Sequence, residues 1–151
     1  MVIYPEGYPE VIVLYSSIYR RWKIADFGAT SEGTSKRLSP TSSRRGTVVY
    51  IAPEVLKEGG YNKKSDIWAF GCIAYEFFTM EKAFRNDWEV MQYRGSEKGF
   101  PKRVIIGKWP KGPAPLLVRD LCKCCVDDAL RFLWKDRPSA VGMLGILNTL
   151  R

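Results

Sequence analysis

The segment KSDIWAFGCIAYEFFTM, residues 64–80, decides the fold, because it predicts one long helix that is apolar on nearly every face. Ser65 is suited to the N-cap, and Asp66 follows in the first turn, where the helix dipole favours negative charge. Beyond them, Glu76 interrupts the most apolar run of the chain. That run is too short to cross a bilayer, so we expect a buried central helix rather than a membrane span.

A short helix and a long loop are expected before this segment. Pro53 suits the first position of a helix, and the glycines at 59–60 suit its end. Residues 29–46 are rich in Ser, Thr, Gly, Lys and Arg, which predicts a long polar loop. No acidic residue occurs in 33–53, so this loop is strongly basic.

Short strands are expected near the N-terminus and further helices near the C-terminus. Residues 11–14 and 22–25 are apolar enough to form two buried strands. After the central helix, the sequence predicts a short helix at 87–93, an amphipathic helix at 116–133 and a final helix from Pro138. In that final helix, three apolar residues share one side: Val141, Leu144 and Leu147. The fold class is therefore mainly α.

Composition indicates one soluble globular domain. The 151 residues are 46% hydrophobic and 26% charged, and the formal net charge of +8 favours anionic partners in general. Four cysteines occur without any histidine, at positions 72, 122, 124 and 125, so reduced thiols are a better interpretation than a zinc site. Free thiols suit a cytoplasmic or nuclear setting, and neither a signal peptide nor membrane insertion is expected.

Four motifs follow one another in a specific order: DFG at 26–28, GTVVYIAPE at 46–54, KSDIWAFGCIAYE at 64–76 and KDRPSA at 135–140. In this order they resemble the second half of a eukaryotic protein kinase domain, over about residues 22–150. The resemblance implies an incomplete kinase-like large lobe with a short β portion before the DFG motif. Residues 1–21 stay unassigned, and 22–151 form a partial kinase domain with an activation segment at 26–54 and large-lobe helices at 55–151.

The resemblance implies that ATP and magnesium are the cofactors. Asp26 would give its carboxylate oxygens to magnesium, which prefers oxygen ligands. Phe27 would pack beneath the nucleotide site, and Gly28 would permit the turn that follows. An ordinary Asp-Gly turn after a strand is the alternative interpretation of these residues.

Three further residues would act as structural anchors by the same resemblance. Glu54 closes the activation segment and would pair with Arg137 across the lobe, and Asp66 would hold the backbone of the catalytic loop. Trp68 and Gly71 belong to the same helix signature. Thr47 would help to shape the substrate pocket, which favours a serine/threonine kinase over a tyrosine kinase.

The basic loop also contains candidate phosphorylation sites: Ser39, Thr41, Ser42 and Ser43. A phosphate there could pair with nearby arginines and order the loop. The alternative is that these residues are only polar loop residues.

The family's catalytic loop has no counterpart in this sequence. Residues 1–25 contain no histidine, asparagine or aspartate, so neither the proton acceptor nor the second magnesium ligand can be assigned. The glycine-rich loop, the strand lysine and its partner glutamate are missing as well. We therefore expect the chain alone to be inactive, and to be poorly soluble or dependent on a partner.

Two origins and three functions remain open. A truncated product of a full kinase gene is favoured over a genuine pseudokinase fragment. The chain either resembles a serine/threonine kinase that acts on protein hydroxyls, or is a non-catalytic interaction module that binds a protein partner. Nucleic-acid binding is not expected, because the basic loop at 36–45 lacks interleaved aromatic residues.

Overall fold

The computed structural model describes residues 13–25, 36–40, 48–79, 81–93 and 124–149. The chain divides into two compact units, residues 1–32 and 33–151, and each is described by itself.

The first unit contains an antiparallel hairpin of β1 (Val13–Ser16) and β2 (Arg21–Ile24). A four-residue turn joins the strands and ends at Arg20, whose φ of 50° lies in the left-handed region. Tyr15 stands opposite Trp22, and their ring centroids are 5.1 Å apart. Both expected strands are present, and the first continues two residues further than predicted. The prediction that they are buried is wrong for β2, because its apolar side chains remain in contact with water: Trp22 is 58% exposed and Ile24 is 67% exposed.

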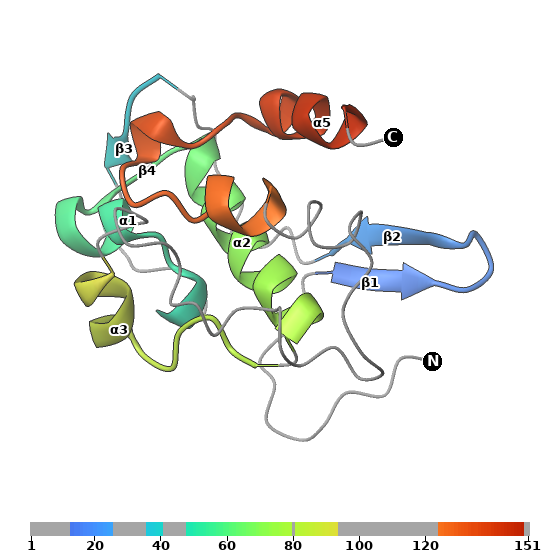
Figure 1. The fold of residues 1–151 in the computed structure, drawn as a ribbon. Helices are drawn as coiled ribbons and strands as arrows, with labels where there is room; N and C mark the ends of the chain where they lie inside the picture. Colours follow the sequence, from blue (N-terminus) through green and yellow to red (C-terminus); the bar gives the residue numbers. More distant parts are fainter. Residues whose placement is uncertain (1–12, 26–35, 41–47, 80, 94–123, 150–151) are drawn as a thin grey trace. The chain divides into compact units, whose positions relative to one another are not determined.

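The second unit is mainly helical, with one small sheet (Figure 1). Its described elements are β3 (Ser39–Pro40), η1 (Val48–Tyr50), α1 (Pro53–Glu58), β4 (Gly60–Tyr61), α2 (Lys63–Thr79), α3 (Asp87–Gln92), the π-helical turn η2 (Cys124–Asp128), η3 (Trp134–Asp136) and α5 (Ala140–Asn148). A mainly α architecture with few strands is therefore confirmed for the described residues.

Helix α1 begins and ends as its sequence predicts. Pro53 occupies the first turn, and the helix stops at Gly59, whose φ of 63° is a left-handed conformation that glycine adopts without strain. The next two residues form β4, which pairs antiparallel with β3. This short sheet connects the basic loop to the segment between α1 and α2.

The N-cap of α2 is Asn62, so the prediction of Ser65 at this position is wrong. Asn62 Oδ1 accepts a hydrogen bond from the backbone N–H of Lys64 at 2.7 Å. In return, the Asn62 N–H donates to Ser65 Oγ at 3.1 Å, which makes a reciprocal capping arrangement. The helix therefore starts three residues earlier than a cap at Ser65 would place it.

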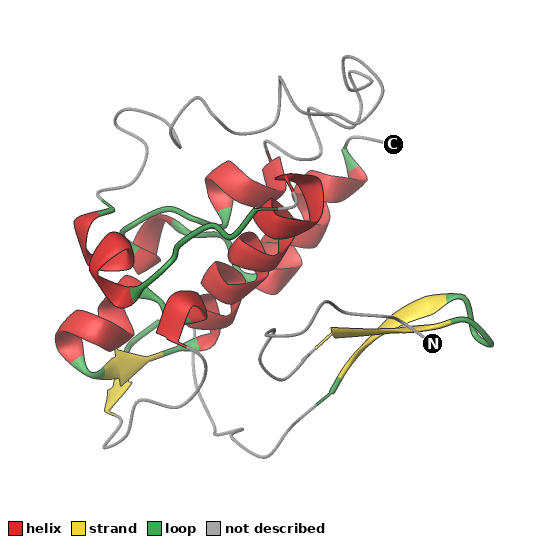
Figure 2. Ribbon diagram, turned by 90° about the horizontal axis from the view of Figure 1, so that it is seen from below, coloured by secondary structure: helices red, strands yellow, loops and turns green. Residues whose placement is uncertain are grey.

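Helices make up most of the described part of the second unit (Figure 2). Helix α2 is central to this unit, and one of its faces is fully buried. Trp68 and Cys72 are completely buried in a cluster that also contains Val126 and Leu130 from the C-terminal segment. The helix approaches that segment closely at Gly71, where an added Cβ would lie 2.8 Å from side-chain atoms of Leu130. Glycine at this position therefore allows the two segments to pack in contact.

The opposite face of α2 is partly exposed. Phe70 is 39% exposed and Phe77 is 60% exposed, although both lie in the run that was expected to be buried on all sides. That expectation is wrong for this face.

Two C-terminal predictions also need correction. The helix expected at 116–133 is described only from residue 124, where it is a π-helical turn that ends at Asp128. The final helix begins at Ala140 with Ser139 as its N-cap, and its buried residue is Met143. Val141 is 80% exposed and Leu144 is 58% exposed, so these two residues do not face the core.

Candidate functional site

The described residues bring Glu54 and Arg137 together in a buried ion pair. Glu54 lies in the first turn of α1, and Arg137 directly follows η3, 83 residues later. Arg137 Nη1 donates to Glu54 Oε1 at 2.8 Å, and Nη2 donates to Oε2 at 2.6 Å. Only 3% of Glu54 and 1% of Arg137 is exposed, so this two-point contact is shielded from water.

Every N–H of the Arg137 guanidinium has an acceptor. Besides Glu54, it donates to three backbone carbonyls, those of Arg131 at 2.7 Å, Lys64 at 3.1 Å and Phe132 at 3.1 Å. The guanidinium also lies over the Trp68 ring, 4.9 Å from its centroid. Arg137 therefore ties α1, the start of α2 and the 131–137 segment into one rigid cluster.

Ser65 completes this cluster. Its hydroxyl donates to Glu54 Oε1 at 2.8 Å while its oxygen accepts from the Asn62 N–H at 3.1 Å. The carboxylate of Glu54 therefore has both an ionic partner and a neutral donor. The geometry agrees with an anchor at the end of the activation segment, and the anchoring role itself stays a prediction.

Asp66 lies in the first turn of α2 next to this cluster. Its side chain is exposed overall, yet the surrounding protein shields the carboxylate enough to raise its pKa above the ordinary value of 3.8. Its role in holding the backbone of a catalytic loop stays a prediction.

Tyr50 and Glu76 form a second polar pair that the sequence interpretation missed. The Tyr50 hydroxyl, at the end of η1, lies 3.0 and 2.9 Å from the two carboxylate oxygens of Glu76 on α2. Burial raises the Glu76 pKa above its ordinary value of 4.5, whereas the tyrosine hydrogen bond and the Lys82 charge oppose the rise. The signal was present in the sequence, because an acid in such an apolar helix needs a partner.

The remaining predicted site residues are not among those the structure describes. These are Asp26, Phe27, Gly28, Thr41, Ser42, Ser43 and Thr47. Ser39 is described only as backbone, in β3. Their roles in nucleotide binding, substrate selection and phosphorylation stay predictions.

A magnesium site needs oxygen donors. Asp26 offers oxygen atoms, which suit this hard cation. Within the ranges that the structure describes, no three His, Cys, Asp or Glu side chains lie close enough to hold a metal ion.

No helix in the described parts of the chain has the length and apolar character needed to cross a membrane.

Comparison with known proteins places the chain in a family. Residues 9–145 match the protein kinase domain family. Serine/threonine-protein kinase Nek3 of Oryza sativa subsp. japonica is 33% identical over 125 residues, which cover 81% of this chain and 19% of that protein. 3-Phosphoinositide-dependent protein kinase 1 of Mus musculus is 36% identical over 137 residues, covering 81% of this chain and 22% of that protein.

A third similar protein matches a shorter part of the chain. Serine/threonine-protein kinase nekl-2 of Caenorhabditis elegans is 42% identical over 65 residues, which are 43% of this chain and 18% of that protein. The chain thus spans less than a third of the length of these curated relatives. The family match includes nine-tenths of the chain and all four motifs quoted above, and two of these three relatives carry serine/threonine kinase names. The chain therefore belongs to the eukaryotic serine/threonine protein kinase domain family.

Proposed function

We propose that this chain contributes the activation segment and large-lobe part of a serine/threonine kinase, whose substrates are hydroxyl groups of proteins. ATP would be the phosphate donor and magnesium its counter-ion, as in the family. The observation that carries this proposal is the buried Glu54–Arg137 pair, because it fixes the end of the predicted activation segment against the large-lobe helices.

The 151-residue polypeptide by itself does not transfer phosphate in this proposal. Phosphoryl transfer depends on positioned charges around the nucleotide and on an acceptor for the hydroxyl proton. Removing one electrostatic group of this kind typically slows an enzyme by a factor of about 10² to 10³. Residues 1–25 contain no histidine, asparagine or aspartate, so several such groups have no candidate within this sequence.

An assay with radiolabelled ATP, magnesium and a mixture of serine- and threonine-containing peptides tests this statement. The purified 151-residue chain should give no transfer above the protein-free blank, and Asp26→Ala should give the same result. Magnesium-dependent transfer by the chain that disappears in Asp26→Ala would overturn the proposed inactivity.

We further propose that Asp26 is the magnesium ligand and that Thr47 helps to shape the pocket that receives the protein substrate.

We assign regulatory phosphorylation to the basic loop, at Ser39, Thr41, Ser42 or Ser43. The arginines at 44 and 45 support this assignment, because a phosphate group forms strong two-point contacts with guanidinium groups. Mass spectrometry of the protein expressed in eukaryotic cells should find phosphate on at least one of the four residues. Complete peptide coverage without phosphate would reject the assignment.

A further inference from the structure

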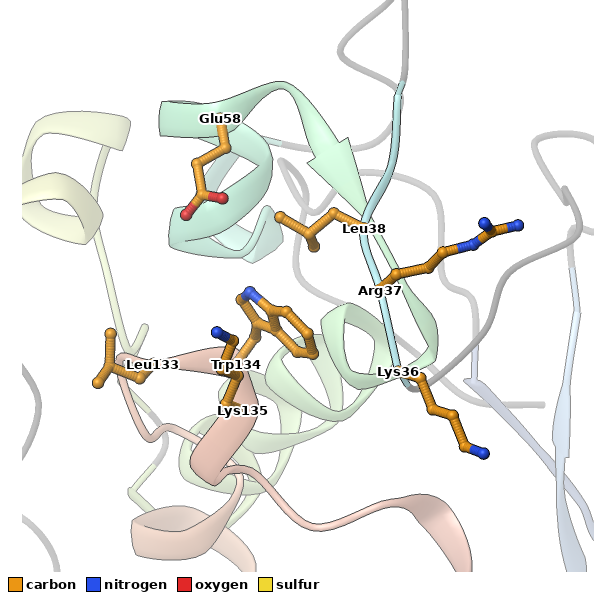
Figure 3. A pocket seen from close by; sticks show the side chains of 7 residues that line it. All are labelled: Lys36, Arg37, Leu38, Glu58, Leu133, Trp134 and Lys135. Carbon is orange, nitrogen blue, oxygen red and sulfur yellow. The ribbon is translucent and has the colours of Figure 1, made fainter.

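The second unit contains a pocket whose lining includes none of the residues to which a catalytic, anchoring or phosphorylation role is assigned above, although residues 36–38 belong to the predicted activation segment. It has a volume of about 530 Å³, within the range of ligand-binding clefts. Three segments form it: the residues before β3, the C-terminal end of α1, and η3 with the residue before it (Figure 3). The lining residues are Lys36, Arg37, Leu38, Glu58, Leu133, Trp134 and Lys135.

The pocket has an apolar centre. Figure 3 shows the indole of Trp134 next to the side chain of Leu38, with each turned toward the other. Leu133 adds a third apolar side chain and is 60% exposed, so part of this surface is in contact with water. A large apolar side chain of a ligand would cover that surface and gain the free energy of its burial.

The rim of the pocket is positively charged. The described lining residues include three cations, Lys36, Arg37 and Lys135, and one carboxylate, that of Glu58. The side chains of Lys36 and Arg37 extend away from Trp134 in Figure 3, so their charges lie at the outer edge of the pocket. Further lysines lie close by, since Lys64 Nζ donates to the Lys135 carbonyl at 2.9 Å and Lys57 lies over the Phe132 ring at 4.4 Å. The potential at the mouth of the pocket therefore favours a negatively charged ligand.

We propose that this pocket docks a short acidic peptide segment of a protein partner. One large apolar side chain of the peptide lies on Trp134 and Leu38, and carboxylates on either side face Lys36, Arg37 and Lys135. The choice of a peptide follows from the combination of a single apolar centre with surrounding cations. A nucleic-acid strand would instead need several aromatic side chains for successive bases, and among the described residues that line the pocket Trp134 is the one aromatic side chain. This docking role goes beyond the proposed function and does not depend on phosphate transfer.

Fluorescence anisotropy with the complete 151-residue chain tests the proposal. The probe is a dye-labelled nine-residue peptide of glutamates and aspartates around one central leucine. We expect Trp134→Ala to weaken its binding about tenfold, and replacement of the central leucine by glycine to have a similar effect. The two changes together should weaken binding little more than either alone, because they remove the same contact.

A charge-reversal variant provides a second, independent test of the proposal. Lys36→Glu combined with Arg37→Glu changes exposed side chains, and should weaken the acidic peptide about tenfold at low salt and less at higher salt. The same double variant should bind a lysine version of the peptide more tightly than the original chain does. A gain of binding of this kind cannot result from a failure to fold.

Two matched controls lie outside the pocket. Trp88→Ala removes a tryptophan that is 66% exposed on α3, and Arg85→Glu reverses an exposed charge. Both should leave peptide binding within about twofold of the original chain. Equal binding by the original chain and all pocket variants would overturn the proposal. So would tighter binding of a single-stranded oligonucleotide of the same net charge that responds to the same variants.

Discussion

The hydroxyl group of Tyr50 lies within 3.0 Å of both carboxylate oxygens of Glu76 and so joins η1 to the central helix α2. The folded-state pKa of Glu76 is raised by burial, so the folded protein holds this proton more tightly than the unfolded chain. Stability contributed by this group is therefore greatest at low pH, and it falls as pH rises from about 4.5 through the folded-state pKa.

Tyr50→Phe should steepen this pH dependence, because it removes a hydrogen bond that lowers the Glu76 pKa. We expect a loss of about 2 kcal/mol in the free energy of unfolding at pH 7, and a smaller loss at pH 4.5. Urea denaturation at both pH values measures the difference. Glu76→Gln is the control, since a neutral amide still accepts the hydrogen bond and should abolish the pH-dependent part. If the free energy of unfolding changed equally between the two pH values in the original chain, Tyr50→Phe and Glu76→Gln, the prediction would be contradicted.

Arg137→Lys should lower the free energy of unfolding by about 3–5 kcal/mol, because one ammonium group cannot replace two contacts to Glu54 and three to backbone carbonyls. Chemical denaturation followed by circular dichroism measures the loss. The matched control is Arg131→Lys, whose exposed pair with Asp128 should contribute less than about 1 kcal/mol. Similar losses in the two variants would show that burial of the Glu54 pair has no special effect.

Gly71→Ala should destabilise the protein by about 1–3 kcal/mol, because its Cβ would lie 2.8 Å from the side chains of Ala129 and Leu130. Gly145→Ala on α5 is the opposite case, since no atom lies within 4 Å of its added Cβ. Alanine is the better helix former, so this variant should gain about 0.5–1 kcal/mol. Thermal unfolding of the two variants measures both changes in stability. A stabilised Gly71→Ala would show that α2 is less closely packed than described.

Phe77→Ser, combined with Phe70→Ser, should reduce self-association of the chain. The two phenylalanines lie seven residues apart on one face of α2 and are 60% and 39% exposed, so they present apolar surface to other molecules. Analytical ultracentrifugation over a range of concentrations measures the effect. Trp88→Ser removes one isolated aromatic residue and should change association much less. An original chain that stays monomeric and unfolds cooperatively would contradict this expectation.

Local signals in the sequence predicted local structure well. Proline at 53 and glycine at 59 defined α1 to the residue, because each restricts or permits backbone angles regardless of the rest of the fold. The cap of α2 was predicted wrongly because Ser65, which has the right chemistry for a cap, instead bonds to Glu54 and the Asn62 backbone. Tertiary contacts of this kind override local preference and leave no trace in a short window of sequence.

In the candidate site, too, some features could be predicted from the sequence and others depend on tertiary contacts. The order of the motifs was sufficient to recognise the kinase family, and it pointed to Glu54 and Arg137 before any geometry was known. Spacing alone could not have paired two residues 83 positions apart, nor Tyr50 with Glu76. Surface exposure is equally hard to predict: Met143 is buried while its neighbours on α5, such as Leu144, remain in contact with water, although all are apolar.

The long separation between Glu54 and Arg137 also has a kinetic consequence. A contact that closes 83 residues of chain carries a large loop-closure entropy and forms only after the intervening segments have come together. The pair should therefore be absent from the folding transition state. Its removal should speed unfolding while leaving the refolding rate almost unchanged, so that this one arginine lengthens the lifetime of the folded state.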